Sequence, residues 1–374
     1  MVSEKFKYLY FLTKIKNLGN IGIKNLVNQF SDPEEIFRLS KNQLRRVEGF
    51  DERTSDSIIH AGKSFSEYEQ KFQLLWKSLT NKGIKYTTLF SDDYPKNLKK
   101  IYDAPIILYY LGELSSNDKY SISVVGTRSP TLYGKTICEK IVGELSKLGI
   151  MTISGMARGI DSIVHQVSTK NNEKTYAVLG SGVDVIYPPE NRILYEKIKN
   201  NGAVISEYEP GSDPDRVNFP RRNRIISGIG LGTLVIETAI KGGSLITAEF
   251  ALDQNKEIFA IPGNISSRKS DGTNELIKKG SAKLVMTVDD ILNELSYSLK
   301  PFLKKEGKEN ELQVSVELDI FEKKLYDVLN DEPVHIDKIN EITGLSISDC
   351  LVGLLSLEFK NLIRQLPGKY FVRM

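Results

Sequence analysis

Hydrophobic and polar positions between residues 120 and 290 follow a regular alternation of two patterns. Short apolar runs without polar alternation are separated by stretches with helical spacing. The apolar runs lie at 123–126, 151–155, 176–180, 203–207, 233–238, 258–262 and 284–287, and the helical stretches at 135–148, 191–200, 245–254 and 275–279. Strands that are apolar on both faces are typical of a buried parallel sheet, so this region predicts an α/β, extended Rossmann-like doubly wound sheet.

Residues 1–75 show a different pattern, which predicts several short helices. Asp32 with Pro33 marks one helix start, and Gly22 and Gly49 each lie between two helical runs. Paired helix–glycine–helix units resemble helix-hairpin-helix or SAM-like modules, in which glycine allows backbone amides to approach a phosphate. The same pattern is common in small helical domains without a ligand, and both interpretations remain open.

The chain beyond the sheet divides again. Residues 301–315 are charged and lack a periodic apolar signal, which indicates a linker between a domain at 76–300 and a small domain at 316–374. The last domain shows helices followed by two strands joined at a Pro–Gly pair, the order of a winged helix. Because its first and third helices are acidic, binding of a protein is at least as compatible with it as reading of DNA.

Composition limits the function without deciding it. The 374 residues include 51 Lys and Arg against 48 Asp and Glu, a net charge of +3, which excludes a uniformly basic coat protein but not a local basic site. Cys138 and Cys350 lie far apart, so neither a disulfide framework nor a zinc site is supported. No apolar run approaches the roughly 20 residues that span a bilayer. We therefore expect a cytoplasmic protein without a membrane partner.

Glycine-rich turns follow several predicted strands. Ligands of open parallel sheets bind at the carboxyl ends of strands, where exposed amides and helix N-termini favour phosphate. The candidate binding residues in these turns are Gly126, Thr127, Arg128, Ser154, Gly155, Arg158, Gly159, Lys241 and Ser244. The spacing of these glycines matches neither a P-loop nor a dinucleotide-binding fingerprint. The sequence therefore gives no specific support for ATP hydrolysis or nicotinamide binding. The alternative is that the glycines serve only tight turns.

Arginines are scarce in this chain but crowd into residues 216–224. This segment adds six candidate binding residues, namely Arg216, Phe219, Arg221, Arg222, Asn223 and Arg224. The planar guanidinium binds phosphate bidentately and an aromatic ring stacks on a base, a combination that suits a single-stranded nucleic acid. We expect one or two of these arginines to pair instead with Glu207, Glu209 or Asp215.

Residues for catalysis are few. His165 lies one turn after Asp161 on a predicted helix and is more typical of a packed histidine than of a general base. Glu237 ends a predicted strand, but no second carboxylate or nucleophile stands at a fitting spacing. No metal-ligand cluster occurs. The sequence predicts no catalytic residue, no metal site and no cofactor.

Nine ordered sequence blocks resemble the DprA/Smf family of DNA-processing proteins, and the resemblance covers essentially the whole chain. They include Gly126-Thr127-Arg128, the run from Ser154 to Asp161, the run from Tyr187 to Asn191, the run from Phe219 to Ile226, and the run from Gly243 to Ala248. The resemblance implies binding of single-stranded DNA without known catalysis. It further implies protection of incoming DNA, loading of RecA during natural transformation, and a homodimer.

Several positions of this chain match positions at which family members contact DNA. The resemblance implies that Arg128 contacts DNA, that Arg216 replaces a DNA-contacting lysine, and that Phe219 stacks on a base. Pro189 stands where some members have a basic residue, so one contact is in doubt there, while Lys241 offers an additional one. Two other classes stay open. One is a nucleoside-monophosphate phosphoribohydrolase on a related fold, and the other is a pure interaction scaffold.

Overall fold

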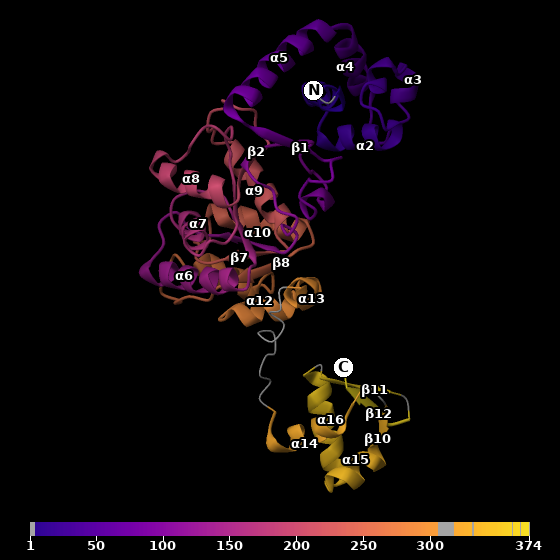
Figure 1. Ribbon diagram of the computed structural model, residues 1–374, viewed down its shortest axis with the longest axis vertical. Coiled ribbons are helices and arrows are strands. Elements are labelled where there is room, and N and C mark those ends of the chain that lie inside the picture. The colour runs from indigo at the N-terminus through magenta and orange to yellow at the C-terminus, as the bar shows by residue number, and fades with distance from the viewer. Residues whose placement is uncertain (1–3, 306–317, 331–332, 361, 367, 374) are drawn as a thin grey trace. The chain divides into compact units, whose positions relative to one another are not determined.

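The computed structural model describes the chain except residues 1–3, 306–317, 331–332, 361, 367 and 374 (Figure 1). It forms two compact units, Met1–Lys305 and Glu306–Met374. The part of the predicted linker from residue 306 to residue 315 lies outside the described residues.

The first unit begins with helices connected by short turns. These are α1 (Glu4–Thr13), α2 (Asn20–Phe30), the 3₁₀ turn η1 (Glu35–Arg38), α3 (Lys41–Leu44), α4 (Glu52–Lys63) and α5 (Phe65–Lys82). The Asp32 carboxylate accepts the Glu34 amide at 2.9 Å just before η1, as the predicted helix start requires. Gly49 has a φ of +80° between α3 and α4, a conformation that glycine adopts without strain.

The predicted domain boundary after residue 75 falls inside α5, so the helices and the sheet are not separated there. The two parts share one apolar core. Phe6 of α1 stacks on Tyr86 of the first strand with ring centroids 3.6 Å apart, and Trp76 of α5 lies 6.5 Å from Phe6. This shared aromatic packing explains why residues 4–305 form one compact unit.

A nine-stranded sheet forms the centre of this unit. Its strands are β1 (Lys85–Thr88), β2 (Ile107–Gly112), β3 (Ser121–Val125), β4 (Met151–Ser154), β5 (Thr175–Val178), β6 (Ala203–Ser206), β7 (Gly232–Val235), β8 (Glu257–Ala260) and β9 (Lys283–Leu284). All seven predicted strands are present, and the five strands from β3 to β7 are buried along their whole length. Strands β1 and β2, which the apolar pattern did not reveal, add an antiparallel edge.

Strand order places a topological switch in the middle of the sheet. The order is β1-β2-β6-β5-β4-β3-β7-β8-β9, so the chain winds from β3 towards β6 and then returns to the other side of β3 with β7. In this order, the strands β6-β5-β4-β3-β7-β8-β9 are all parallel to their neighbours, which confirms the predicted doubly wound sheet. Ligands of such sheets bind where the winding reverses, here beyond the carboxyl ends of β3 and β7.

Helices cover both faces of the sheet (Figure 1). They are α6 (Leu132–Lys147), α7 (Ile160–Lys170), α8 (Arg192–Asn201), α9 (Asn218–Ile229), α10 (Gly243–Asp253), α11 (Asp271–Lys278), α12 (Val288–Glu294) and α13 (Ser296–Lys305), with 3₁₀ turns η2 (Leu98–Lys100) and η3 (Pro189–Asn191). Helices α6, α7 and α8 pack side by side on one face, and α9 packs with α10 on the other. Between these two layers the central strands β3 to β7 are buried, while the edge strand β9 is exposed.

Two helices correct the sequence interpretation. The arginine-rich segment, for which the apolar pattern predicts no helix, forms α9 from Asn218 onward, so its arginines point in different directions around a helix. Helix α13 continues to Lys305 and includes the first part of the predicted linker. Phe302 is buried there and stacks on Tyr120 with ring centroids 4.8 Å apart. The linker therefore begins later than residue 301.

The second unit is a winged helix, as predicted. It contains α14 (Ile320–Val328), β10 (Val334–His335), α15 (Ile336–Thr343), α16 (Ile347–Phe359), β11 (Ile363–Leu366) and β12 (Tyr370–Arg373). The strand order is β10-β12-β11, all antiparallel. Ser346 caps α16 by accepting the Asp349 amide at 3.1 Å. Its core is separate from that of the first unit.

Candidate nucleic-acid interface

A hollow of about 700 Å³ opens at the topological switch, beyond the carboxyl ends of β3 and β7. It is lined by three turns and by the first residues of α9 and α10. Of the residues that the sequence predicted for DNA binding, it brings together Gly126, Thr127, Arg128, Arg216, Phe219, Arg222, Asn223 and Ser244. Ser154, Gly155, Arg158, Gly159, Arg221, Arg224 and Lys241 are not among its lining residues.

The turn that carries Arg128 is hydrogen-bonded to Glu237, which follows β7. Thr127 donates its amide to the Glu237 carbonyl at 2.7 Å, and the Glu237 carboxylate accepts both the amide and the hydroxyl of Thr131. Gly159, with a φ of +76°, passes so close that a side chain there would meet the Thr127 carbonyl at 2.4 Å. These contacts fix the backbone, while the Arg128 side chain is exposed.

An aromatic pair forms a second wall of the hollow. Phe219, in the first turn of α9, lies with its ring centroid 5.4 Å from that of Tyr187. Gly180 leaves room for it, since a methyl group there would lie 3.0 Å from the Phe219 ring. Tyr187 was not among the predicted site residues, although it is the only aromatic residue of its sequence block. Arg216, just before α9, is exposed beside this pair.

Arg222 does not reach the solvent. Its guanidinium donates to the carbonyls of Gly155, at 2.6 Å, and Val178, beneath the hollow, and only 4% of the residue is exposed. Burial lowers the Arg222 pKa to about 10, against the attraction of the Asp161 carboxylate. Burial likewise raises the Asp161 pKa, while the positive Arg222 opposes that rise. Arg222 therefore braces the turn after β4 from inside.

Arg224 is also engaged internally. It forms ion pairs with Glu207 at 2.5 Å and with Asp103 at 3.2 Å, which fulfils the expectation that one of the clustered arginines pairs with Glu207. Burial raises the pKa of Glu207, and the Arg224 charge works against this. Of the remaining predicted residues, Arg158 pairs with Glu190 at the surface.

The other predicted residues divide between surface and interior. Ser154 is fully buried and donates its hydroxyl to the Val124 carbonyl at 2.7 Å. Ser244, at the start of α10, has a buried hydroxyl without a partner among the described residues. Arg221 and Lys241 are exposed and point away from the protein interior. Of the predicted cations, Arg128, Arg216, Arg221 and Lys241 are exposed and have no ion-pair partner among the described residues.

The candidate catalytic side chains are occupied elsewhere. Glu237 is 2% exposed, and both of its carboxylate oxygens accept hydrogen bonds from Thr131. His165 is fully buried with Nδ1 at 2.8 Å from the Thr175 hydroxyl, and burial lowers its pKa to about 3. Within the described residues, no group of three His, Cys, Asp or Glu side chains is arranged for a metal ion, and no helix is long and apolar enough to cross a bilayer.

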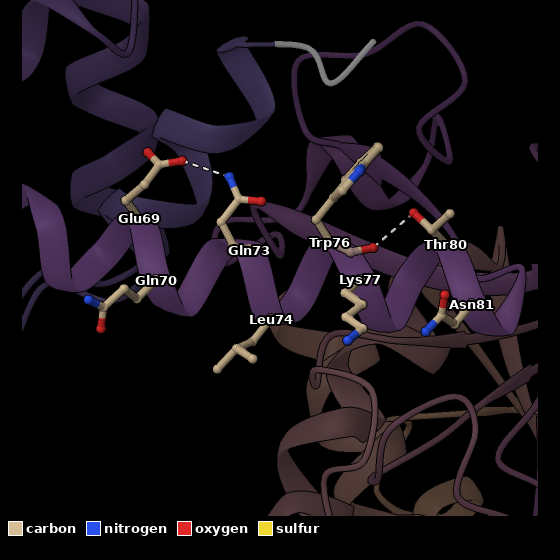
Figure 2. Close-up of a pocket in the computed structure, with 8 residues that line it drawn as sticks. All are labelled: Glu69, Gln70, Gln73, Leu74, Trp76, Lys77, Thr80 and Asn81. Carbon is tan, nitrogen blue, oxygen red and sulfur yellow. Dashed lines mark hydrogen bonds between the residues drawn. The ribbon is translucent and has the colours of Figure 1, made fainter.

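A second hollow, of about 750 Å³, lies along α5 (Figure 2). Its lining residues all come from this one helix. The hydrogen bonds among them join neighbouring turns, from Gln73 to Glu69 and from Thr80 to the Trp76 carbonyl, and the side chains do not converge on one point. This hollow offers no set of groups that would hold a charged ligand.

Comparison with known proteins identifies the family. A model of the DNA recombination-mediator protein A family matches residues 85–296, and a model of the DprA winged helix domain matches residues 313–369. The chain belongs to the DprA/Smf family. Protein Smf of Synechocystis sp. is 32% identical over the full length of both chains. DNA processing protein DprA of Streptococcus pneumoniae is 40% identical over 61% of this chain and 81% of that protein.

Solved structures of DprA proteins share the fold. The X-ray structure of DNA processing protein A from Streptococcus pneumoniae superposes with a TM-score of 0.66 and 34% identity, covering 77% of this chain and 97% of that one. A structure of the Helicobacter pylori protein, described as showing its unique single-stranded DNA binding mode, has a TM-score of 0.51 and 31% identity over 57% and 96% of the two chains. This DprA/Smf chain is a DNA-processing recombination-mediator protein.

Proposed function

We propose that this DprA/Smf chain binds single-stranded DNA in the hollow at the topological switch and acts without catalysis. The observation that carries the proposal is that Arg128 and Arg216, both exposed, line the same hollow as the half-buried ring of Phe219. Guanidinium groups bind phosphates of any sequence, and an aromatic face stacks on any base, so this arrangement suits an unpaired strand.

Electrostatics in the hollow favour an anionic ligand. The one carboxylate among its lining residues, Asp161, accepts the amides of Gly155 and Ala157 and faces the buried Arg222, so it does not oppose a phosphate. The N-termini of α9 and α10 open towards the same space without a side-chain cap, which leaves their partial positive charge available. The DNA-binding mode named for the Helicobacter pylori relative supports the same ligand class.

We further propose the downstream role that the resemblance implies. The bound strand is protected and transferred to RecA during natural transformation, and the protein acts as a homodimer in the cytoplasm. A phosphoribohydrolase is less well supported, because the carboxylate that it would use, Glu237, is buried and fully hydrogen-bonded. Arg158, Gly159 and the glycine turns remain proposed contacts, whereas Arg222 and Arg224 contribute by holding the site in place.

The decisive experiment measures binding of labelled single- and double-stranded oligonucleotides at two salt concentrations, followed by addition of RecA. Single-stranded DNA should bind more tightly, and its affinity should fall with salt by a slope of about −0.7 per phosphate contacted. Arg128→Ala combined with Arg216→Ala should reduce affinity for all sequences alike, because phosphate contacts carry no base information. Unchanged binding of the double variant would overturn the site. Release of free base from nucleoside monophosphates would favour the enzyme.

A further inference from the structure

Two further cations, the exposed Arg268 and the half-buried Lys269, lie beside the hollow on the loop of residues 262–270 that follows β8. We refer to this loop as the rim loop. The Lys269 ammonium donates to the Ser129 carbonyl, next to Arg128. From the other side of the loop, the Tyr133 hydroxyl donates to the Pro262 carbonyl at 2.7 Å. The rim loop is therefore attached to the turn that carries Arg128.

The rim loop also adjoins the turn after β7. Gly272, in the first turn of α11 just after the rim loop, donates its amide to the Thr238 carbonyl at 2.8 Å. Both Thr238 and Ala239 line the hollow, and a methyl group on Gly272 would meet the Ala239 carbonyl at 2.7 Å. A strand leaving the hollow between these two turns would thus meet the rim loop next.

The three segments along this path carry positive but no negative side chains. Residues 126–135, 238–248 and 261–270 contain no aspartate or glutamate. Arg268 is exposed and has no ion-pair partner among the described residues, and Lys241 is exposed on the neighbouring turn. The first carboxylate after the loop, Asp271, lies at the start of α11. Such a surface attracts a polyanion and offers it unpaired cations.

Exposed apolar side chains accompany these cations. Ile265 is 92% exposed, Leu132 81%, Ile240 60% and Tyr133 47%. The exposure of Ile265 is imposed by a defined turn, in which the Asn264 side chain accepts the Ser266 amide at 2.9 Å and the Asn264 carbonyl accepts the Ser267 amide at 2.9 Å. Apolar and aromatic groups beside cations are the combination by which proteins hold the bases and phosphates of single strands.

We propose that the single strand held in the hollow continues over the rim loop, with Arg268 and Lys241 contacting its phosphates and Ile265 and Tyr133 contacting its bases. This inference rests on the proposed function, because it assumes that the hollow holds single-stranded DNA. It adds that the protein binds two consecutive stretches of one strand, the first in the hollow and the second on the rim loop. Long oligonucleotides therefore bind more tightly than short ones, because only long ones also contact the rim loop.

The test compares fluorescein-labelled oligothymidylates of about 6 and about 20 nucleotides, a range that separates a filled pocket from an extended track. The full-length protein is used, as wild type and as Arg268→Ala. At 0.15 M salt each lost phosphate contact reduces affinity about fourfold, because the slope is about −0.7 per contact. Arg268→Ala should lose about fourfold for the long oligonucleotide and nothing for the short one.

Two further variants sharpen the comparison. Ile265→Ser should weaken the long oligonucleotide alone, and its effect should not depend on salt, because a base contact releases no counterions. The matched control is Lys174→Ala combined with Lys197→Ala, which removes two exposed lysines, one immediately before β5 and one in the second half of α8. Both positions precede the amino ends of strands, at the opposite edge of the sheet. Neither oligonucleotide should be affected by this control.

The outcomes separate this inference from the proposed function. If the wild-type protein binds neither oligonucleotide, the proposed function fails. If it binds both and the rim variants match wild type on the long one, the inference is overturned while the proposed function stands. Equal losses for both lengths would also overturn it, since the residues would then belong to the hollow. A loss confined to the transfer to RecA would assign the rim loop to a protein partner and overturn the DNA track.

Discussion

Glu237 and Thr131 are joined through both oxygens of the Glu237 carboxylate, which accept the Thr131 amide at 2.8 Å and the Thr131 hydroxyl at 2.7 Å. The same hydroxyl accepts the Gly134 amide at 3.1 Å and so caps α6. The Glu237 carbonyl accepts the amide of Thr127 at the other end of the turn. A single residue at the end of β7 thus fixes both ends of the turn that presents Arg128.

Glu237→Ala should therefore affect stability and DNA binding together. Loss of the carboxylate leaves the amide and the hydroxyl of Thr131 without their acceptor, which costs about 1–3 kcal/mol for a buried donor. The turn is then free to move, and Arg128 is no longer held in place for a phosphate. Urea unfolding measures the first effect, and oligonucleotide binding under folding conditions measures the second.

Glu249→Ala provides the matched control for this prediction. Glu249 is exposed on α10 and forms no ion pair within the described residues, so neither stability nor binding should change. If Glu237→Ala were destabilised yet bound DNA as wild type does, the carboxylate would support the fold without positioning Arg128.

Arg221 and Arg222 are neighbours in sequence, but Arg221 is exposed and Arg222 is buried. Substitution of Arg222 should therefore reduce stability much more than substitution of Arg221. Arg222→Met leaves the Gly155 and Val178 carbonyls and the Asp161 carboxylate buried without their cation, which we expect to destabilise the first unit by about 3–5 kcal/mol. Arg221→Ala removes an exposed side chain and should change stability by no more than about 0.5 kcal/mol. Chemical denaturation of both variants, with circular dichroism of the folded state, measures the contrast.

DNA binding distinguishes the same two positions further. Arg221→Ala should weaken single-stranded DNA binding only if its exposed guanidinium contacts a phosphate, and the salt slope would then decrease by about 0.7. An Arg222→Met protein as stable as wild type would contradict the bracing role of Arg222. It would return that residue to the list of DNA contacts.

These two arginines also show what the sequence could predict. The order of apolar runs was sufficient for the doubly wound sheet, because strands buried on both faces carry an uninterrupted apolar signal. The edge strand β1 escaped detection because Lys85–Thr88 is short and only partly buried. Strand β2 is apolar and largely buried, but it lies outside the region of regular alternation on which the prediction rests. Glycine turns and arginines mark strand ends, which is why several of the predicted site residues line one hollow at a single edge of the sheet.

The roles of individual arginines could not be predicted in the same way. The sequence predicts that one or two arginines of the segment from Arg216 to Arg224 pair with acidic residues, but it does not indicate which ones. In helix α9, successive residues are turned by about 100°, so Arg221 faces solvent while Arg222 faces the sheet. The partner of Arg222 is mainly backbone, which no residue pattern reveals.

Acid should destabilise the first unit through His165. Burial, reinforced by the positive Arg222, lowers its pKa to about 3, whereas an unfolded histidine takes up a proton near pH 6.5. Between these values the unfolded state binds more protons, so stability falls as pH decreases. From pH 6.5 to pH 5 the loss attributable to His165 should be about 1.5 kcal/mol. Urea unfolding followed by the fluorescence of Trp76, the single tryptophan, measures it.

His165→Asn removes this titration while leaving a polar group near the position of Nδ1, opposite the Thr175 hydroxyl. The variant should be less stable at pH 7 but should show a flatter dependence on pH between 6.5 and 5. His60→Asn, on the exposed side of α4, should preserve the wild-type profile. Parallel profiles for wild type and His165→Asn would mean that another group titrates in this range.

Substitutions at two glycines of the predicted turns should distinguish a glycine needed for packing from a glycine that leaves room for a ligand. A methyl group on Gly155 would lie 2.6 Å from the Arg222 guanidinium, so Gly155→Ala should displace that side chain and destabilise the protein by about 1–3 kcal/mol. Gly243, at the start of α10, has no atom within 4 Å of such a methyl group. Gly243→Ala should therefore leave the unfolding free energy unchanged.

Gly243→Ala then becomes a probe of the bound strand. If a phosphate approaches the amides at the start of α10, the added methyl group stands in its path, and single-stranded DNA binding should weaken although the protein is as stable as before. The size of the effect is measured by titration at constant salt beside Gly19→Ala, a substitution just before α2 at another glycine with open space around it and an ordinary negative φ. Full affinity in Gly243→Ala would show that the strand keeps its distance from α10 and depends on the side chains of Arg128 and Arg216 instead.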